Sequence, residues 1–505
     1  MPASPDSSVT SPLRTCSWAW LLATAVLVAF RTLPFAWWGT LDFDADQAVV
    51  GLMAQHIAEF RALPVYQYAF GYVLMVTAYV TAPFMWLLGP TPFALKLPLA
   101  LMNVGVALGL VTAIVRAGLA PSVAVLLSLP VIVAAPVVNA GLMDALGMTV
   151  EPLLFVILLW HARRSPVLFG IIAAIGFHVR EFVAYGVAAV LAVDVISGAL
   201  ATRARRRHWL VVAVAALGTS AVVGGVARFA SVRGPGTWMS EQGSGNLATL
   251  GGAFCFAPAQ AWRNVQELGA SYLGVLWGAS PVALSEAAVQ SRLTQGLPWA
   301  WPVLALLTLA LVFWLAFRWR ALWRARTTAL AQLGLFLVLV GLQAVLVYAV
   351  SRCGPLLVVT LRYALLGAFL PTGLVLLAWV VGPPRGVQRA IGATLVALAA
   401  LNLSTHARLW HEQWRTPVVS NRAQLGPALE ARGIRHARSD YWTAYYVVFT
   451  TQERVIVGAD SFSRIDEYER ILSRRAADVV RISTDPCGDE PAIVPGYHVC
   501  PLTAP

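Results

Sequence analysis

The stretch Leu41-Asp42-Phe43-Asp44-Ala45-Asp46 alternates three aspartates with apolar residues, directly after the first long apolar run of the chain. Carboxylates at the mouth of an apolar region repel one another and lose hydration, so such a cluster more often marks chemistry or ion binding than packing. Hydrophobic residues make up 58% of the chain, charged residues 12%, and the mean hydropathy is +0.70. This composition is far from that of soluble domains and predicts an integral membrane enzyme.

The apolar runs predict an all-α polytopic membrane protein with about eleven transmembrane helices. They lie near residues 16–38, 93–116, 120–140, 142–161, 167–179, 181–200, 209–228, 298–317, 328–350, 363–381 and 390–404. The apolar run 66–88 is assigned to the outer surface, because only then do all arginine clusters face the cytoplasm. We therefore expect a multi-pass protein of the bacterial cytoplasmic membrane with a cytoplasmic N-terminus. Arginines between spans explain the net charge of +12 without nucleic acid.

Two large periplasmic loops are predicted within a transmembrane domain of residues 1–404. The first, 39–92, carries the aspartates, and the second is 229–297. In the first loop, apolar residues recur at helical spacing with polar residues between them: Val50, Met53, Ile57 and Phe60. This pattern is typical of a helix lying in the membrane interface. The stretch 262–277 predicts a second surface helix over the site.

Residues 405–505 are charged and mixed in composition, which predicts a small soluble α/β domain. The residue types indicate strands at 441–449 and 454–457 and a helix at 465–480. An odd number of spans places this domain outside the cytoplasm, where Cys487 and Cys500 can form a disulfide.

Four motifs stand in and after the first loop: Asp44-Ala-Asp-Gln-Ala-Val-Val-Gly-Leu-Met-Ala-Gln-His-Ile57, Ala82-Pro-Phe84, Leu88-Gly-Pro90 and Ala94-Leu-Lys-Leu97. Together they resemble the opening of the GT-C-type membrane glycosyltransferases, the group of the protein O-mannosyltransferases, similar to glycosyltransferase family 39, and the lipid A aminoarabinose transferase. In that family, the aspartate of an Asp-Glu pair in the first outer loop is the catalytic carboxylate. This position matches Asp46.

Weaker local matches follow in the family's order: Glu151-Pro152, Arg180 and Arg362-Tyr363. The resemblance implies a second acidic site at Glu151 and basic residues near the donor. Two departures stand out. Gln47 replaces the family's glutamate, and residues 71–75 lack the acid that close relatives carry. Both departures remove candidate base or metal ligands, so the sequence names no cofactor, and a divalent metal is compatible with the chemistry without being required.

The chemistry also follows from the residue types. Moving a sugar from a polyprenyl phosphate to a hydroxyl needs a base near the acceptor and cations near the leaving phosphate. Asp46 is the predicted base with Asp44 as its neighbour, since close acids raise one another's pKa. The predicted phosphate-binding residues are Lys96, Arg180, Arg362 and Tyr363.

Each assignment has a structural alternative. Asp42 and Asp44 also suit helix caps, and Lys96 also suits a side chain that reaches toward the lipid headgroups. Arg180 can pair with Glu181 at a bend between half-spans. Two residues have simpler structural roles open to them: Glu151 as a first-turn helix carboxylate and Arg362 as an interface anchor.

The function predicted is transfer of a sugar from a polyprenyl-phosphate donor to an acceptor hydroxyl on the outer face of the membrane. The acceptor is a protein, a glycolipid or a polysaccharide, and the lipid bilayer is the other partner. Two alternatives stay open: a transporter or lipid flippase whose acids bind a coupling ion, and a catalytically inactive scaffold that keeps the fold.

Overall fold

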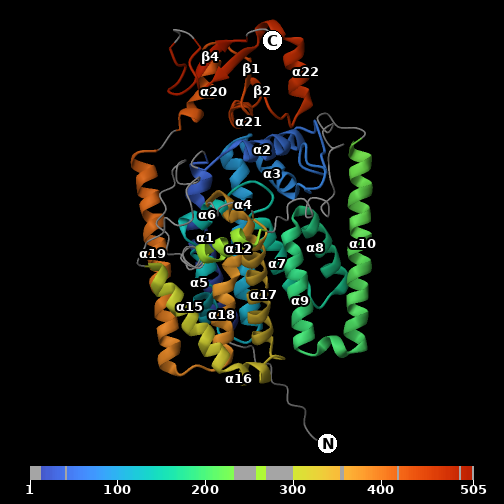
Figure 1. Cartoon of the computed structure of the whole chain (residues 1–505), viewed down its shortest axis with the longest axis vertical. Helices are drawn as coiled ribbons and strands as arrows, with labels where there is room; N and C mark the ends of the chain where they lie inside the picture. The colour runs from blue at the N-terminus through green and yellow to red at the C-terminus, as the bar shows by residue number, and fades with distance from the viewer. Residues whose placement is uncertain are drawn as a thin grey trace, which may run out of the picture.

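The computed structural model describes residues 13–39, 42–231, 257–268, 300–352, 358–417, 420–487 and 491–502. Long helices stand side by side in a bundle, with the C-terminal domain at one end (Figure 1). The arginine-rich helix α16 (Trp319–Arg324) lies at the opposite end.

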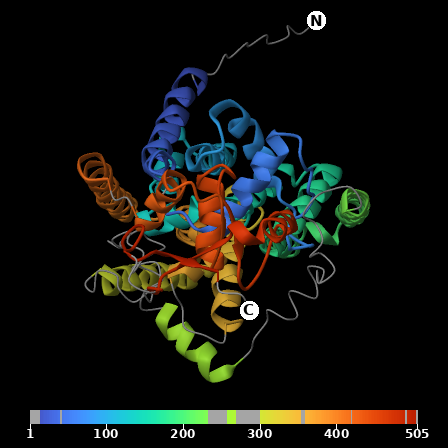
Figure 2. The same ribbon diagram turned by 90° about the horizontal axis from the view of Figure 1, so that it is seen from above.

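Within the described residues, six helices are long and apolar enough to span a membrane, or seven if one bent pair counts as a single span. The six are α1 (Leu13–Trp37), α4 (Pro92–Arg116), α10 (Arg203–Ser231), α17 (Ala329–Val350), η5 (Val358–Ala368) continued by α18 (Phe369–Val380), and α19 (Arg385–Arg415). The bent pair is α5 (Pro121–Ile132) and α6 (Pro136–Leu142), which meet at 81°. In Figures 1 and 2, α10 and α19 stand on opposite sides of the bundle.

The predicted count of eleven spans is not confirmed, because several of the predicted spans are short helices. These are α7 (Val150–Ala162), α8 (Pro166–Val179), α9 (Ala184–Ile196) between the turns η1 (Glu181–Val183) and η2 (Ala199–Ala201), and α15 (Ala300–Phe317). A helix of 13 residues such as α7 reaches about 20 Å, less than the roughly 30 Å of a hydrocarbon core. For α7 and α9, the predicted spans 142–161 and 181–200 had joined the helix to neighbouring apolar turns, whereas the predicted span 167–179 coincides with the short helix α8.

Helices α2 (Ala45–Ala58) and α3 (Val76–Leu88) lie across the end of the bundle, beneath the C-terminal domain (Figure 1). The sequence predicted that the first of these segments is a helix lying in the membrane interface, and the helix is present. Twelve of the fourteen residues of α2 are buried within the protein, Gln55 and His56 among them. The C-terminal domain covers the polar face. Of the second predicted surface helix, only α12 (Pro258–Glu267) is described; the rest lies outside the described residues.

The C-terminal domain has a four-stranded sheet of order β2-β1-β3-β4, in which β4 alone is antiparallel to its neighbour. The strands are β1 (His436–Ser439), β2 (Ile456–Ala459), β3 (Val480–Ser483) and β4 (His498–Pro501), and the helices are α20 (Asn421–Ala431), α21 (Tyr441–Thr450), α22 (Asp466–Arg474) and η6 (Ala476–Asp478). The predicted disulfide joins Cys487 and Cys500, whose Cα atoms are 5.8 Å apart.

Residues 441–449 form a helix, so the predicted strand there is wrong. Their aromatic and β-branched side chains favour strands in isolation, but two features override that preference. Asp440 caps the helix by accepting hydrogen bonds from Trp442 N and Thr443 N at 2.9 and 3.1 Å. In addition, the side chains from Thr443 to Phe449 are all buried. The helix is apolar all round because it lies between the sheet and α2.

Helix α21 docks on α2 through aromatic rings. Phe43, just before α2, meets Tyr446 and Phe449 with ring centroids 5.3 and 5.6 Å apart. Phe449 also fills the space above Gly51, where an added Cβ would lie 2.5 Å from Cε2 of the ring. Glycine at this position therefore permits the close approach of the two domains.

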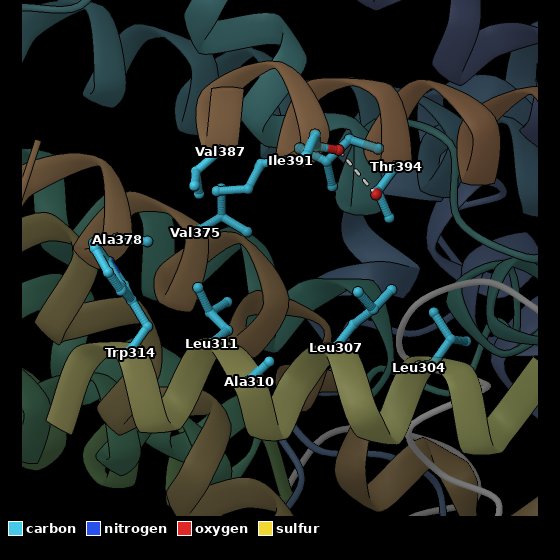
Figure 3. Close-up of a pocket in the computed structure, with 12 residues that line it drawn as sticks. Leu304, Leu307, Ala310, Leu311, Trp314, Val375, Ala378, Val387, Ile391 and Thr394 are labelled. Carbon is cyan, nitrogen blue, oxygen red and sulfur yellow. Dashed lines mark hydrogen bonds between the residues drawn. The ribbon is translucent and has the colours of Figure 1, made fainter. Parts of the chain in front are cut away.

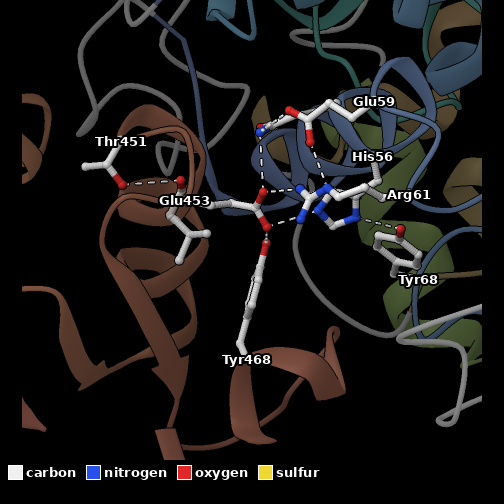
Figure 4. Close-up of polar contacts among 9 residues, drawn as sticks. His56, Glu59, Arg61, Tyr68, Thr451, Glu453 and Tyr468 are labelled. Carbon is white, nitrogen blue, oxygen red and sulfur yellow. Dashed lines mark hydrogen bonds and ion pairs between the residues drawn. The ribbon is translucent and has the colours of Figure 1, made fainter. Parts of the chain in front are cut away.

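A polar cluster closes the other end of the same interface (Figure 4). Glu453 of the C-terminal domain pairs with Arg61 and lies 3.1 Å from His56 Nε2, and its Oε1 accepts a hydrogen bond from Tyr468 at 2.7 Å. Burial raises the pKa of Glu453, but hydrogen bonds and charge from His56, Tyr468 and Arg61 outweigh it and leave the pKa at about 2. The ionised carboxylate therefore stabilises docking.

We predict that Gly51→Ala destabilises the protein. Alanine improves helix propensity by about 1 kcal/mol, but overpacking against the buried Phe449 ring costs about 1–3 kcal/mol. The midpoint of thermal unfolding should fall, and the double variant Gly51→Ala/Phe449→Leu should recover part of the loss. Gly218→Ala is the control, since nothing lies within 4 Å of its Cβ position. A Gly51→Ala protein as stable as the wild type would contradict the close packing.

Docking of the C-terminal domain should weaken in acid. The pKa of Glu453 is about 2 in the folded protein against an ordinary 4.5, so its stabilisation is complete above about pH 5 and is lost as the pH falls toward 2. Amide hydrogen exchange over α2, measured between pH 6 and pH 3, should report this loss. Glu453→Gln should start with weaker protection and remove that part of the pH dependence; an unchanged pH dependence would refute the role of Glu453.

Candidate functional site

The aspartates of the first loop build the start of α2. Asp44 is the N-cap, with extended backbone, and its Oδ1 accepts a hydrogen bond from Gln47 N at 3.0 Å. Asp46 lies in the first turn, where the helix dipole favours a carboxylate. Burial, followed by repulsion from Asp46, raises the pKa of Asp44 to about 6. Asp44 therefore caps α2, which is the structural alternative given for it above, and its carboxyl group also has a pKa of about 6, near neutral pH.

Gln47 connects this turn to the loop between α6 and α7. Its Nε2 donates to Asp42 O at 3.1 Å and to Asp144 Oδ1 at 3.3 Å, while its Oε1 accepts from Ala145 N at 3.2 Å. The residue is 1% exposed. An ionised glutamate at position 47 could not donate a hydrogen bond to Asp144. The glutamine that stands in place of the family's glutamate is therefore suited to Asp144, the acid that it faces.

Asp144 joins the acidic cluster and was missed by the sequence analysis, which had placed it inside a span. Burial, and then the charge of Asp42, raises the pKa of Asp144 well above its usual range, against the opposing charge of Lys96. Lys96 is fully buried and donates to Asp42 O, so its ammonium lies among the acids and not at the headgroups. A lone aspartate in an apolar run was the signal that could have identified Asp144.

Three arginines gather around two aromatic rings. Arg180 lies 5.8 Å from the ring centroid of Phe182, which meets Tyr363 edge-on at 6.1 Å. Arg352 and Arg362 lie 5.6 and 5.3 Å from the ring centroid of Tyr363. The Nε atom of each arginine is buried and has no hydrogen-bond partner among the described residues. This cationic cluster retains donors for an anion. Arg352 was not among the phosphate-binding residues predicted from the sequence.

The cationic cluster and the acids share one region. Arg362 is within electrostatic range of Asp46 and Asp144, and its charge counters the raised pKa of Asp44. Arg362 thus connects the two groups: it interacts electrostatically with the acids and shares the ring of Tyr363 with Arg352.

Arg180 touches the loop that carries Asp144. Its Nη2 lies 3.0 Å from Met148 Sδ, and its Nη1 lies 3.8 Å from Glu181 Oε2. The ion pair with Glu181, one of the two roles that the sequence allowed for Arg180, is therefore present, but its N–O distance of 3.8 Å is long. The Nε atom of Arg180 has no partner among the described residues.

Asp46 is held from the C-terminal domain. Its Oδ1 accepts hydrogen bonds from Tyr441 Oη at 2.7 Å and Arg464 Nη2 at 3.0 Å. These partners stand 395 and 418 residues away in the chain, and nothing in the local sequence indicated them.

Glu151 lies in a closed set of hydrogen bonds. The hydroxyl of Thr77 donates to its Oε1, and Thr149 N donates to its Oε2 at 3.0 Å. The carboxylate is 1% exposed. It joins α3 to the start of α7, which fits the structural alternative for this residue better than a second reacting acid.

Within the part of the chain that the structure describes, no group of three or more histidines, cysteines, aspartates or glutamates is arranged to hold a metal ion. Among the acids, Gln47 and Lys96 make hydrogen bonds to Asp144 Oδ1 and Asp42 O, respectively.

A separate apolar cavity of about 280 Å³ lies between α15, α18 and α19 (Figure 3). Its lining includes Leu304, Trp314 and Ile391 and contains no charged side chain. Such a lining suits hydrocarbon, and it offers no group for the transfer chemistry.

No protein-family model matches the chain, and no curated protein matches it. Among solved structures, ArnT from Cupriavidus metallidurans bound to undecaprenyl phosphate is similar, with a TM-score of 0.50 and 13% identity over 93% of each chain. The archaeal oligosaccharyltransferase AglB from Archaeoglobus fulgidus, in complex with an inhibitory peptide and a dolichol-phosphate, has a TM-score of 0.51 and 13% identity over 94% of this chain and 70% of AglB. The chain therefore has the fold of the GT-C membrane glycosyltransferases, as its opening motifs predicted.

Proposed function

We propose that this protein transfers a sugar from a polyprenyl-phosphate donor to an acceptor hydroxyl on the extracytoplasmic side of the bacterial cytoplasmic membrane. The observation that carries the proposal is the pair of charged groups within the GT-C fold: the carboxylates at the start of α2, and a cationic cluster whose member Arg362 stacks on Tyr363 and interacts electrostatically with those acids. Two solved proteins of the same fold bind undecaprenyl phosphate and dolichol-phosphate, which supports a lipid-linked donor here.

In this proposal Asp46 takes the proton as the acceptor oxygen attacks the anomeric carbon of the sugar. The bond between that carbon and the phosphate oxygen breaks, and the phosphate leaves with the bonding electrons. Arg180, Arg352 and Arg362 bind the departing phosphate and stabilise its growing charge. Tyr363 keeps two of these guanidinium groups in place by stacking. Lys96 instead balances the acids, because it bonds Asp42 O.

Asp44 competes with Asp46 for the role of base. A pKa of about 6 leaves a group largely ionised at neutral pH and still basic, which suits proton abstraction. Asp46 has a partly exposed carboxylate, with a side chain that is 21% exposed, and its position matches the catalytic aspartate of the family that the opening motifs resemble.

The alternatives of a transporter and an inactive scaffold gain no specific support. The acids lie on α2, at the end of the bundle (Figure 1), whereas a coupling-ion site is expected near the bilayer midplane. The glutamine in the family's glutamate position has three hydrogen bonds, so its presence does not indicate decay of the site.

Asp46→Asn should lower transfer from a polyprenyl-phosphate sugar by about 100-fold or more, since a general base contributes roughly 10²–10⁴-fold. Purified protein in nanodiscs with a labelled donor provides the assay. Asp460→Asn is the matched control, because Asp460 pairs with Arg481 within the C-terminal domain. Unchanged transfer by Asp46→Asn would reject Asp46 as the base. If Asp44 takes the proton instead, wild-type transfer should rise with pH through about 6, and Asp44→Asn should abolish that rise.

Single Gln substitutions at Arg180, Arg352 and Arg362 should each raise the KM for the donor by about 10-fold, as expected for loss of one charge-assisted hydrogen bond of roughly 1.5 kcal/mol. Titration of the donor at saturating acceptor measures this. Arg326→Gln is the control: Arg326 also has a buried, unpartnered Nε and stacks on Trp323 at 4.6 Å, but it lies beside α16. Equal effects at Arg326 and at the three clustered arginines would argue against a phosphate site.

A further inference from the structure

The contact between Asp46 and the C-terminal domain is a closed triangle. Tyr441 Oη donates to Asp46 Oδ1 at 2.7 Å, and Arg464 Nη2 donates to the same oxygen at 3.0 Å. Arg464 Nε also donates to Tyr441 Oη at 2.9 Å. Both bonds to the carboxylate use Oδ1, and among the described residues no hydrogen bond reaches Oδ2. One oxygen is therefore fixed while the other remains available.

Arg464 is itself fixed from both domains. Its side chain is 5% exposed, its Nη1 donates to Tyr68 O at 3.3 Å, and its guanidinium lies 4.1 Å from the ring centroid of Phe70. On the other side, its backbone N donates to Tyr445 Oη. A guanidinium with this many partners has one preferred position, so it can define the direction of the carboxylate that it binds.

The two donors come from one edge of the sheet. Tyr441 begins α21, two residues after β1 ends at Ser439, and Arg464 lies in the connection from β2 to α22. Strands β1 and β2 are parallel, so both residues lie beyond the carboxyl ends of the strands. In parallel α/β sheets this edge is where functional residues gather. Here the edge faces the start of α2.

We propose that Arg464 and Tyr441 are positioning residues of the active site, which hold Asp46 by Oδ1 and direct Oδ2 toward the acceptor hydroxyl. This inference rests on the proposed function. It assigns the C-terminal domain a part in the chemical step itself, in addition to any contact with the acceptor. Proton abstraction depends steeply on geometry, and a displacement of about 1 Å costs roughly 100-fold in rate.

The test uses the full-length protein in nanodiscs and three variants. Arg464→Gln and Tyr441→Phe remove one donor each, and Arg464→Lys keeps the charge without the planar fork. Two matched controls lie in the same domain: Arg438→Gln, which loses the pair with Glu469, and Tyr497→Phe, which loses the hydrogen bond from Arg422. Amide hydrogen exchange over α2 reports whether the domain stays docked.

We expect Arg464→Gln to lower kcat by about 100-fold with the KM of donor and acceptor within about twofold, and Arg464→Lys and Tyr441→Phe to lower kcat by about 10-fold. Protection of α2 should remain, and the control variants should transfer like the wild type. Wild-type kcat in Arg464→Gln would overturn the proposal. So would a rise in transfer, because the contact would then be inhibitory, or a loss of activity that appears only together with loss of α2 protection.

A second readout does not depend on sugar transfer. Carbodiimide coupling at Asp46, followed by mass spectrometry, should be faster in Arg464→Gln than in the wild type, because the carboxylate loses a partner. Unchanged labelling would overturn the contact whatever the activity. If the wild type transfers no sugar from polyprenyl donors while labelling responds as expected, the proposed function fails and the positioning role fails with it, but the interdomain contact stands. The two failures are thereby distinguished.

Discussion

The structure depends on how charge is balanced where α2 lies between the helical bundle and the C-terminal domain. Asp44 is repelled by Asp46, and Asp144 by Asp42 and Asp44, and burial adds to the cost of ionising Asp44 and Asp144. Basic side chains from different elements counter the negative charge of these carboxylates. Lys96 of α4 counters the Asp42–Asp144 side, Arg362 acts on Asp44, Asp46 and Asp144, and Arg464 binds Asp46 from the other domain. Both domains therefore contribute to the charge balance of the acidic cluster.

In the cationic cluster, by contrast, positively charged groups retain hydrogen-bond donors without partners. Arg180, Arg352 and Arg362 are held by aromatic stacking, and each has a buried Nε without a partner among the described residues. Such groups are costly to leave unsatisfied, and an anion would satisfy them. In the proposed function, a phosphate bound there is the leaving group, and Arg362 is the member of the cluster that interacts electrostatically with the acids.

Sequence reasoning was successful where the signal was local. Apolar runs located the helices, the opening motifs indicated the GT-C fold, and Cys487 with Cys500 indicated the disulfide. It failed where partners are distant in the chain. The residues of α21 favour a strand by composition, but burial on two sides makes them a helix. The burial of the polar residues of α2 had no local signal, because the domain that covers them lies some 400 residues later in the chain. For the same reason, Arg464 and Tyr441 carried no signal, and Asp144 was hidden in an apparent span.

The most direct test of the account is a cryo-electron microscopy structure of the wild-type protein in nanodiscs with undecaprenyl phosphate. The account predicts density for the phosphate in contact with Arg180, Arg352 and Arg362, on the side that faces Asp46, with the prenyl chain leading into the bilayer. Phosphate density at another location, with the three guanidinium groups unoccupied at saturating lipid, would contradict it.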